Sequence, residues 1–195
     1  MEHPRRYALL LCSVVLASMV FSDAAARRSD SSAPLDAGAQ LVRLDDAAGS
    51  FALVLAANAD LYNLPRDIRR VVVLVEDDSN SSEPRLDRQA DTLILVPQFS
   101  VADGRELPAD LPVWHSKQAW VEGEVSSEGR VGLSAFTVLD ALVSYLGRAS
   151  HFPQLQEVVF VGRGTTADLV ERHRSRPQVA TSFRIRHAGA RQARL

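Results

Sequence analysis

The sequence is almost without cysteine, and its single cysteine, Cys12, lies in an apolar segment near the N-terminus. A chain with one cysteine forms no internal disulfide, and if that segment is removed the remaining chain also has no thiol nucleophile. Leu11 stands directly before Cys12, where a lipoprotein signal needs a small residue, so we expect no lipid attachment.

An excess of charge of one sign is also missing, because the formal net charge is -2 in 195 residues. This balance gives no reason to expect nucleic acid or an anionic membrane surface as a partner. Arginines gather late in the chain, but only Phe183 interleaves with them, whereas nucleic-acid-binding grooves combine basic and aromatic residues. We interpret the cluster as a solvated edge, with a heparin-like or nucleic-acid patch as the alternative. The cluster comprises Arg172, Arg174, Arg176, Arg184, Arg186, Arg191 and Arg194.

The N-terminal apolar run, residues 8–21, is shorter than the roughly 20 residues that a membrane-spanning helix needs. Two arginines precede it and the small residues 24–26 follow it. This order predicts a secretory signal peptide over residues 1–26, cleaved after Ala26. We therefore expect a secreted or periplasmic protein with no membrane contact after cleavage. An uncleaved N-terminal anchor is the alternative.

Metal-binding spacing is absent as well, since no pair of histidines has the H-x-x-x-H pattern. We expect every histidine to be a surface or loop residue, and we expect no metal and no cofactor. The acidic turn Glu76-Asp77-Asp78 does not follow the spacing of a calcium loop, so we interpret it as solvated. The histidines are His3, His115, His151, His173 and His187.

Two apolar runs rich in branched residues, 71–75 (VVVLV) and 92–96 (TLILV), predict strands buried on both faces. Such strands are typical of a parallel sheet with helices on both faces. Residues 50–57 fit either a strand or a short buried helix, because periodicity alone does not separate the two. The polar stretch that begins at residue 27 predicts a flexible leader over 27–48, followed by a domain over 49–195.

A helix is predicted from Ser134, a good N-cap, to Gly147, because apolar residues recur between them at helical spacing. Residues 158–161 then predict a buried strand, 165–174 a helix and 179–185 a last strand. The order strand, strand, helix, strand, helix, strand predicts an open, mostly parallel α/β sheet with right-handed crossovers.

Residues 98–132 show no clear period and are interrupted by glycine and proline. A loop of this length in a compact domain is often functional. The preferred interpretation is that Trp114 and Trp120 pin the segment to the body of the domain, because large amphipathic rings are favourably buried.

Residues 157–168, EVVFVGRGTTAD, predict a strand, a tight glycine turn and a helix in immediate succession. This is the frame of a nucleophile elbow, in which a serine between two glycines stands on a sharp turn above a parallel sheet. Gly164 takes the position of that serine. Thr165 and Thr166 would need an adjacent base to act as nucleophiles, and the sequence implies none. The turn could hold an anion with Arg163, but it lacks the lysine and spacing of a Walker motif.

From about residue 61 onward the chain resembles a secreted or exported branch of the α/β-hydrolase superfamily. FTVLD at 136–140, FPQL at 152–155 and VVFVG at 158–162 are similar to a family pattern of S-F-x-V-L-D-A-L, F-P-x-L, a buried strand and G-H-S-A-G-G-Q. LILVPQF at 93–99 is similar to a strand that ends in A-P-Q-F. The resemblance implies a partial α/β-hydrolase-like fold.

The elbow departs from the family pattern, because Gly162, Arg163, Gly164 and Thr165 stand where the family has G-H-S-A. The nucleophile is therefore replaced by glycine. The small residue after it, whose backbone N–H helps to form the oxyanion hole in the family, is replaced by threonine.

The other catalytic parts of the family are altered or missing too. The early H-G turn that supplies an oxyanion donor reads Glu76-Asp77, and carboxylates oppose a developing oxyanion. The triad acid and histidine follow the elbow in chain order, and only 27 residues follow position 168. His173 and His187 come too soon after the elbow to match the family histidine, and we interpret Asp140 as a helix-face residue.

We therefore predict an exported α/β-hydrolase-like protein that has lost catalysis, and the sequence indicates no substrate, ligand or partner for it. An active ester or amide hydrolase that uses unrecognised residues, or a partner's residues, is the alternative. A parallel sheet that stops one strand after the elbow leaves an unpaired edge, so we also expect a marginally stable or self-associating protein.

Overall fold

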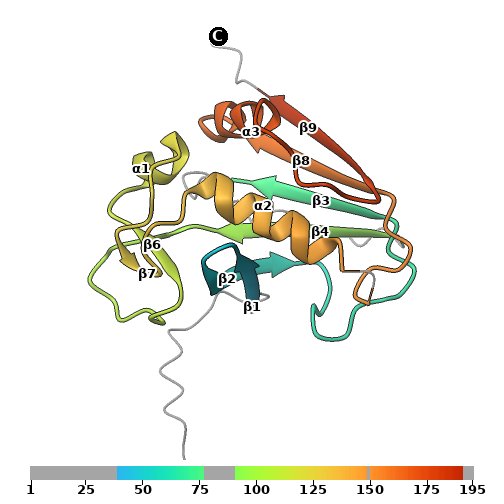
Figure 1. The fold of residues 1–195 in the computed structure, drawn as a ribbon, viewed down its shortest axis with the longest axis horizontal. Coiled ribbons are helices and arrows are strands. Elements are labelled where there is room, and N and C mark those ends of the chain that lie inside the picture. Colours follow the sequence, from blue (N-terminus) through green and yellow to red (C-terminus); the bar gives the residue numbers. More distant parts are fainter. Residues whose placement is uncertain (1–38, 77–90, 149, 191–195) are drawn as a thin grey trace, which may run out of the picture. The chain divides into compact units, whose positions relative to one another are not determined.

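The main sheet has six strands in the order β1-β2-β4-β3-β8-β9 (Figure 1). This computed structural model describes residues 39–76, 91–148 and 150–190, which all belong to one compact unit, residues 32–195. The β4–β3, β3–β8 and β8–β9 pairs are parallel, whereas β1–β2 and β2–β4 are antiparallel, so the sheet is mixed and mostly parallel. The strands span Ala39–Asp46 (β1), Gly49–Ala57 (β2), Arg70–Val75 (β3), Thr92–Gln98 (β4), Glu157–Arg163 (β8) and Arg184–Ala190 (β9).

The first two strands form a hairpin that closes at the pair Asp46 and Gly49. β2 is a strand rather than the short helix that the sequence left open, and its residues 51–55 are all buried, so the strand is covered on both faces. Residues 39–46, which the sequence assigns to a flexible leader, form β1. They do so because Val42 and Leu44 alternate with exposed residues, so one side of the strand is buried.

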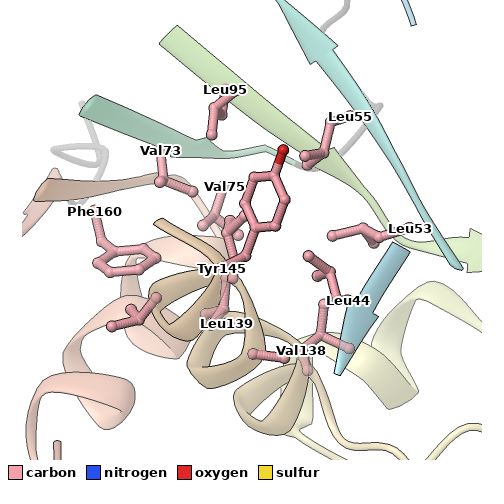
Figure 2. Close-up of a cluster of buried hydrophobic side chains, with 14 of the residues drawn as sticks. Leu44, Leu53, Leu55, Val73, Val75, Leu95, Val138, Leu139, Tyr145 and Phe160 are labelled. Atoms are coloured by element: carbon pink, nitrogen blue, oxygen red, sulfur yellow. The ribbon is translucent and has the colours of Figure 1, made fainter. Parts of the chain in front are cut away.

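Helices α2 (Ala135–Leu146) and α3 (Thr166–Arg174) pack on the same face of the main sheet. The Ser134 side chain caps α2 as predicted, since its hydroxyl oxygen accepts a hydrogen bond from the Thr137 backbone N–H at 3.2 Å. Figure 2 shows the apolar side of α2 against the strands, with Leu139 and Phe160 among the buried side chains. The buried side chains between the helices and the sheet form the hydrophobic core, and packing on this core fixes the position of α3.

The opposite face of the sheet is buried at β2, where Ala52 and Val54 pack with Leu111, and is only half-buried along β3 and β8. Its side chains, which alternate along β3, β4 and β8 with fully buried ones, include Val72, Ile94 and Val159. The sequence predicts helices on both faces, and α2 and α3 account for one of them. Within the described ranges no helix covers the other face.

Residues 98–132 fold into a small three-stranded sheet, β5-β6-β7, and a short helix, α1. Trp114 is fully buried, and the ring of Trp120 stacks on Phe99 with centroids 4.5 Å apart. The predicted anchoring of this segment by its two tryptophans is confirmed. The elements span Ser100–Val101 (β5), Pro112–Trp114 (β6), Lys117–Glu122 (α1) and Glu128–Gly129 (β7).

The predicted position of the last strand is wrong, because β9 begins at Arg184 rather than at residue 179. Exposed and half-buried residues alternate over the first four residues of β9, as expected for an edge strand. The apolar residues at the start of 179–185 therefore did not mark the beginning of the strand. The predicted signal peptide and cleavage site lie outside the described residues. Among the helices of the described residues, none is long and apolar enough to cross a membrane.

Candidate functional site

The turn between β8 and α3 has the backbone of an elbow. Gly164 and Thr165 alone separate the end of the strand at Arg163 from the start of the helix at Thr166. Gly164 has a φ of +59°, which lies in the left-handed backbone region that residues other than glycine rarely adopt. A Cβ atom placed on Gly164 would meet nothing within 4 Å, so a side chain there would extend into open space.

Gly162 plays a different part in the same turn. A Cβ atom on Gly162 would lie 2.5 Å from the Thr166 carbonyl oxygen and 2.8 Å from Ala167 Cα. A Cβ on Gly189 of β9 would also come close to this turn, at 3.2 Å from the Ala167 carbonyl oxygen. The first turn of α3 therefore packs directly on the backbones of β8 and β9, which only glycine permits.

The Thr166 hydroxyl holds this turn together. It is fully buried, donates to the Val75 carbonyl at 2.5 Å and accepts from the Arg163 N–H at 3.0 Å. The end of β3, the end of β8 and the start of α3 thus meet at one oxygen atom. This hydroxyl is engaged in structure and is not placed to act as a nucleophile.

The carboxyl edge of the sheet beside the elbow carries an ion pair. Glu76 follows β3, and its carboxylate lies 3.6 Å from the Arg163 guanidinium. Arg163 is 68% exposed, so this is a weak, solvent-screened contact. Asp77, the second residue of the predicted altered oxyanion turn, lies outside the described residues. A carboxylate in this position stabilises no oxyanion.

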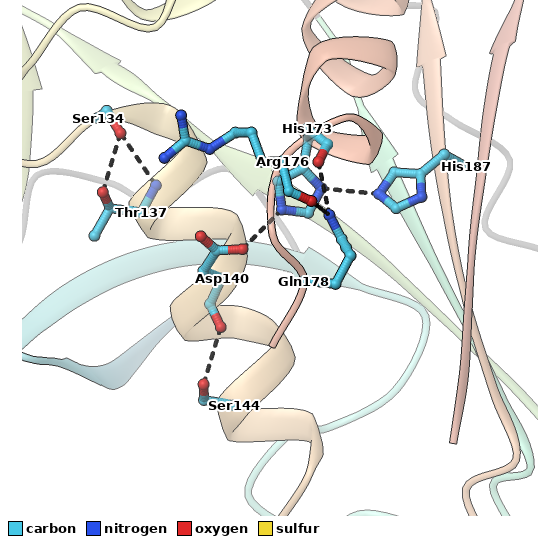
Figure 3. A network of polar contacts seen from close by, with 8 residues as sticks. All are labelled: Ser134, Thr137, Asp140, Ser144, His173, Arg176, Gln178 and His187. Carbon is cyan, nitrogen blue, oxygen red and sulfur yellow. Dashed lines mark hydrogen bonds and ion pairs between the residues drawn. The ribbon is translucent and has the colours of Figure 1, made fainter. Parts of the chain in front are cut away.

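Three side chains that the sequence analysis left apart meet at the other end of α3 (Figure 3). Asp140 of α2 lies 2.9 Å from His173 Nε2, and His173 Nδ1 lies 2.9 Å from His187 Nε2 of β9. His173 is fully buried, and both histidine rings pack against the ring of Phe160. We call these three polar residues the Asp–His–His network. It joins α2, α3 and β9 across the sheet face.

The proton positions in the network follow from the donors and acceptors. A carboxylate only accepts hydrogen bonds, so the proton between Asp140 and His173 is carried by His173 Nε2. When both rings are neutral, His187 Nε2 donates to His173 Nδ1. The pKa of His187 is lowered to about 4, first by burial and then by electrostatic interaction with His173 and Arg174, which Glu171 partly offsets. His187 is therefore neutral at pH 7.

The network is too far from the elbow to take part in chemistry there. His173 lies nine positions beyond Gly164 along α3, and a rise of 1.5 Å per residue separates them by about 13 Å. A base must reach its nucleophile within hydrogen-bond distance or through one water molecule. The two sites are therefore independent.

The predicted surface location is wrong for His173, which is fully buried and bonded on both ring nitrogens. It holds for His115, whose side chain is 61% exposed. Asp140 is on a helix as expected, but it binds His173 rather than solvent alone. Across residues 39–76, 91–148 and 150–190, no group of three or more His, Cys, Asp or Glu side chains could hold a metal ion.

A scan against protein-family models and a search of the curated proteins found no match to this chain. Among solved structures, the chain is similar to the siderophore hydrolase EstA from Aspergillus nidulans, with 11% sequence identity and a TM-score of 0.32. The alignment covers 70% of this chain and 54% of EstA, so the chain spans about half the length of that structure. A similarity this small carries no conclusion about fold or activity.

Proposed function

We propose that this chain is an exported α/β-hydrolase-like protein that does not catalyse ester or amide hydrolysis. The observation that carries the proposal is Gly164, which holds the left-handed turn between β8 and α3 without a side chain. A nucleophile elbow places its serine on such a turn, directly before the helix. This chain keeps the turn and lacks the nucleophile.

Two further features of the described residues support the absence of hydrolysis. Glu76 places a carboxylate near Arg163 at the elbow, where a hydrolase needs hydrogen-bond donors for an oxyanion. The buried Thr166 hydroxyl is bonded to the backbone of β3 and β8. Neither residue has the environment that an activated nucleophile or its oxyanion requires.

A second candidate function is hydrolysis through the Asp–His–His network, because an acid that orients a histidine is typical of acid–base catalysis. The network favours this candidate by holding His187 in a neutral form at pH 7. A nucleophilic hydroxyl or thiol bonded to His187 is missing from the described residues. The non-catalytic proposal is therefore better supported.

The experiment compares the purified chain with Gly164→Ser, using p-nitrophenyl acetate turnover and labelling by a fluorophosphonate probe. We expect the native chain to be inactive and unlabelled, and Gly164→Ser to be labelled slowly, because its hydroxyl would stand directly before the start of α3, whose backbone N–H groups can stabilise an oxyanion. The matched control is Gly104→Ser, which also places a serine at an open, left-handed glycine (φ +81°) but in a loop that does not lead directly into a helix.

Each outcome is informative about one part of the proposal. Ester turnover by the native chain would refute the loss of catalysis and direct attention to His187. Equal labelling of the two serine variants, or of neither, would contradict a functional elbow geometry at residue 164. Export is tested separately by mass spectrometry of the secreted protein, which we expect to begin at residue 27.

We further propose that the chain self-associates through β9. This strand has the outermost position in the sheet order, so the backbone groups on its outer side face no further strand among the described residues. Unpaired strand edges favour association with another copy. Light scattering after gel filtration should show dimers or larger species, and a monodisperse monomer with a sharp, reversible melt would contradict the proposal.

A further inference from the structure

A cavity of about 510 Å³ opens at the amino ends of the parallel strands, and four arginines line it. Arg69 and Arg70 stand at the start of β3, and Arg184 and Arg186 lie on β9. We call it the arginine cavity. The other described late arginines are used differently, since Arg172 donates to backbone carbonyls of α1, Arg174 pairs with Glu171, and Arg176 lies over the Phe136 ring.

One carboxylate inside the arginine cavity already shows what its guanidinium groups bind. Glu157 of β8 is 13% exposed, with its two carboxylate oxygens 3.0 Å from Arg70 Nε and 3.5 Å from Arg186 Nη1. Arg70 and Arg184 are the register neighbours of Glu157 on the strands to either side. The cavity thus presents arginines on both sides of a single oxyanion.

The positive charge exceeds what the acidic residues of the cavity neutralise. Asp91 and Glu157 are the only acids among the lining residues, against four arginines. Arg69 and Arg184 are exposed, and neither forms an ion pair with any acidic side chain that the structure describes. Two guanidinium groups are therefore available to a ligand.

The backbone beneath these arginines is fixed by hydrogen bonds between the strand starts. The Arg69 N–H donates to the Asp91 carbonyl at 2.9 Å, the Gln156 N–H donates to the Arg69 carbonyl at 2.8 Å, and the Arg184 N–H donates to the Gln156 carbonyl at 2.9 Å. These bonds fix the spacing of the backbone positions that carry the arginines at the strand starts before a ligand arrives. A preorganised site loses less entropy on binding.

We propose that the arginine cavity binds a phosphate or sulfate group. The planar guanidinium fork matches such tetrahedral oxyanions with two parallel hydrogen bonds, and charge-assisted bonds of this kind are stronger than neutral ones. No aromatic side chain lines the cavity, so stacking of nucleic-acid bases has no platform there. The site lies at the amino ends of β3 and β8, about 20 Å from the elbow at their carboxyl ends, given 3.3 Å per strand residue.

The test is calorimetric titration of the full chain with inorganic phosphate and with pyrophosphate, at constant ionic strength set with chloride. The double variant Arg69→Gln/Arg184→Gln should weaken binding by about tenfold or more, which corresponds to the loss of at least one charge-assisted contact. Arg105→Gln, a control at an exposed arginine paired with Asp103 elsewhere on the surface, should bind like the native chain. A sulfated disaccharide used as a second titrant distinguishes a saccharide source of the oxyanion from free phosphate.

The variant Glu157→Gln is a more specific test, because it removes the carboxylate that competes with the ligand for Arg70 and Arg186. We expect it to tighten phosphate binding several-fold while the circular dichroism spectrum stays native. Absence of binding by the native chain at millimolar phosphate would overturn the proposal. So would equal affinities for the native chain and the double variant, or weakening by Arg105→Gln as large as that of the double variant.

Discussion

The two ends of α3 differ in what makes them resemble a catalytic site: the start of the helix has the backbone geometry, and its end has the acid–base side chains. At its start, Gly162 and Gly164 form a tight strand-to-helix turn that carries no nucleophile. At its end, His173 joins Asp140 and His187 in a buried network of acid–base groups. The elbow has the form of a catalytic site without the reactive group, and the network has reactive groups without a nucleophile. Neither end supplies what the other lacks, because the length of the helix keeps them apart.

The structure at the start of α3 depends on residues without side chains, whereas the structure at its end depends on buried polar side chains. The elbow depends on atoms that are absent, since a Cβ on Gly162 would overlap the helix backbone. The network depends on side chains that are present and buried. Adding atoms should therefore break the first, and removing hydrogen-bonding groups should break the second.

The largest effect is expected for Gly162→Val. The new side chain would force α3 away from β8, because its Cβ would lie 2.5 Å from the Thr166 carbonyl oxygen, a backbone atom that cannot rotate away. Overpacking of this kind costs about 3 kcal/mol or more of the free energy of unfolding. Urea denaturation followed by circular dichroism measures the loss.

The control for this prediction is Gly164→Ala, two residues further along the same turn. Its Cβ meets nothing within 4 Å, so the substitution costs only the left-handed backbone strain of about 1–2 kcal/mol. If the two variants lose equal stability, close packing of α3 on the strand is not what requires Gly162.

A smaller loss is expected for His173→Leu, which keeps most of the buried volume and removes both hydrogen bonds of the ring. Asp140 and His187 would each lose a partner, and unpaired polar groups of this kind cost about 2–3 kcal/mol together. Thermal or urea unfolding checks the value. A double-mutant cycle with Asp140→Asn should give a clear coupling energy, because the two side chains touch.

The matched control is His115→Leu. The His115 side chain is 61% exposed and lies 3.9 Å from Glu124, so its replacement should change stability by less than about 0.5 kcal/mol. A loss at His173 no larger than that at His115 would mean that the Asp–His–His network contributes nothing to the fold.

The elbow and most of the fold were predictable because their signals are local. The apolar run before Gly162 predicts a buried strand, the serine at 134 predicts a helix start, and the glycine pair predicts a sharp turn. Each of these depends on a few neighbouring residues and on backbone preferences. The order of strands in the sheet has no such local signal.

The network was missed because its members are far apart in sequence. Asp140 and His173 are 33 positions apart, and His173 and His187 are 14 apart, so no spacing rule joins them. The wrong position predicted for the last strand also hid the network. A strand over residues 179–185 ends before His187 and therefore gives that residue no place beside α3. With β9 at Arg184–Ala190, His187 becomes the register neighbour of Phe160 and faces the buried helix.

The smallest effect, and the one that isolates the network from the elbow, is a pH dependence of stability. The pKa of His187 is about 4 in the folded chain, against 6.5 for an unperturbed histidine. Between these values the unfolded chain takes up a proton that the folded chain does not bind. Stability is therefore lost as the pH falls through about 6.5 to 4, and the contribution is fully present above pH 6.5.

The half-buried His187 ring is partly screened by water, so we expect about 1–2 kcal/mol of loss across this window. Unfolding by urea at pH 7 and pH 4.5 gives the loss for the native chain, and His187→Gln gives the background from all other titrating groups. The difference between the two chains should appear only below pH 6.5. If His187→Gln loses as much stability as the native chain, the ring is not held neutral by its burial beside His173, and the predicted pH dependence is wrong. Gly164→Ala, in contrast, should follow the native pH profile at a lower overall stability, because the substitution leaves the Asp–His–His network unchanged.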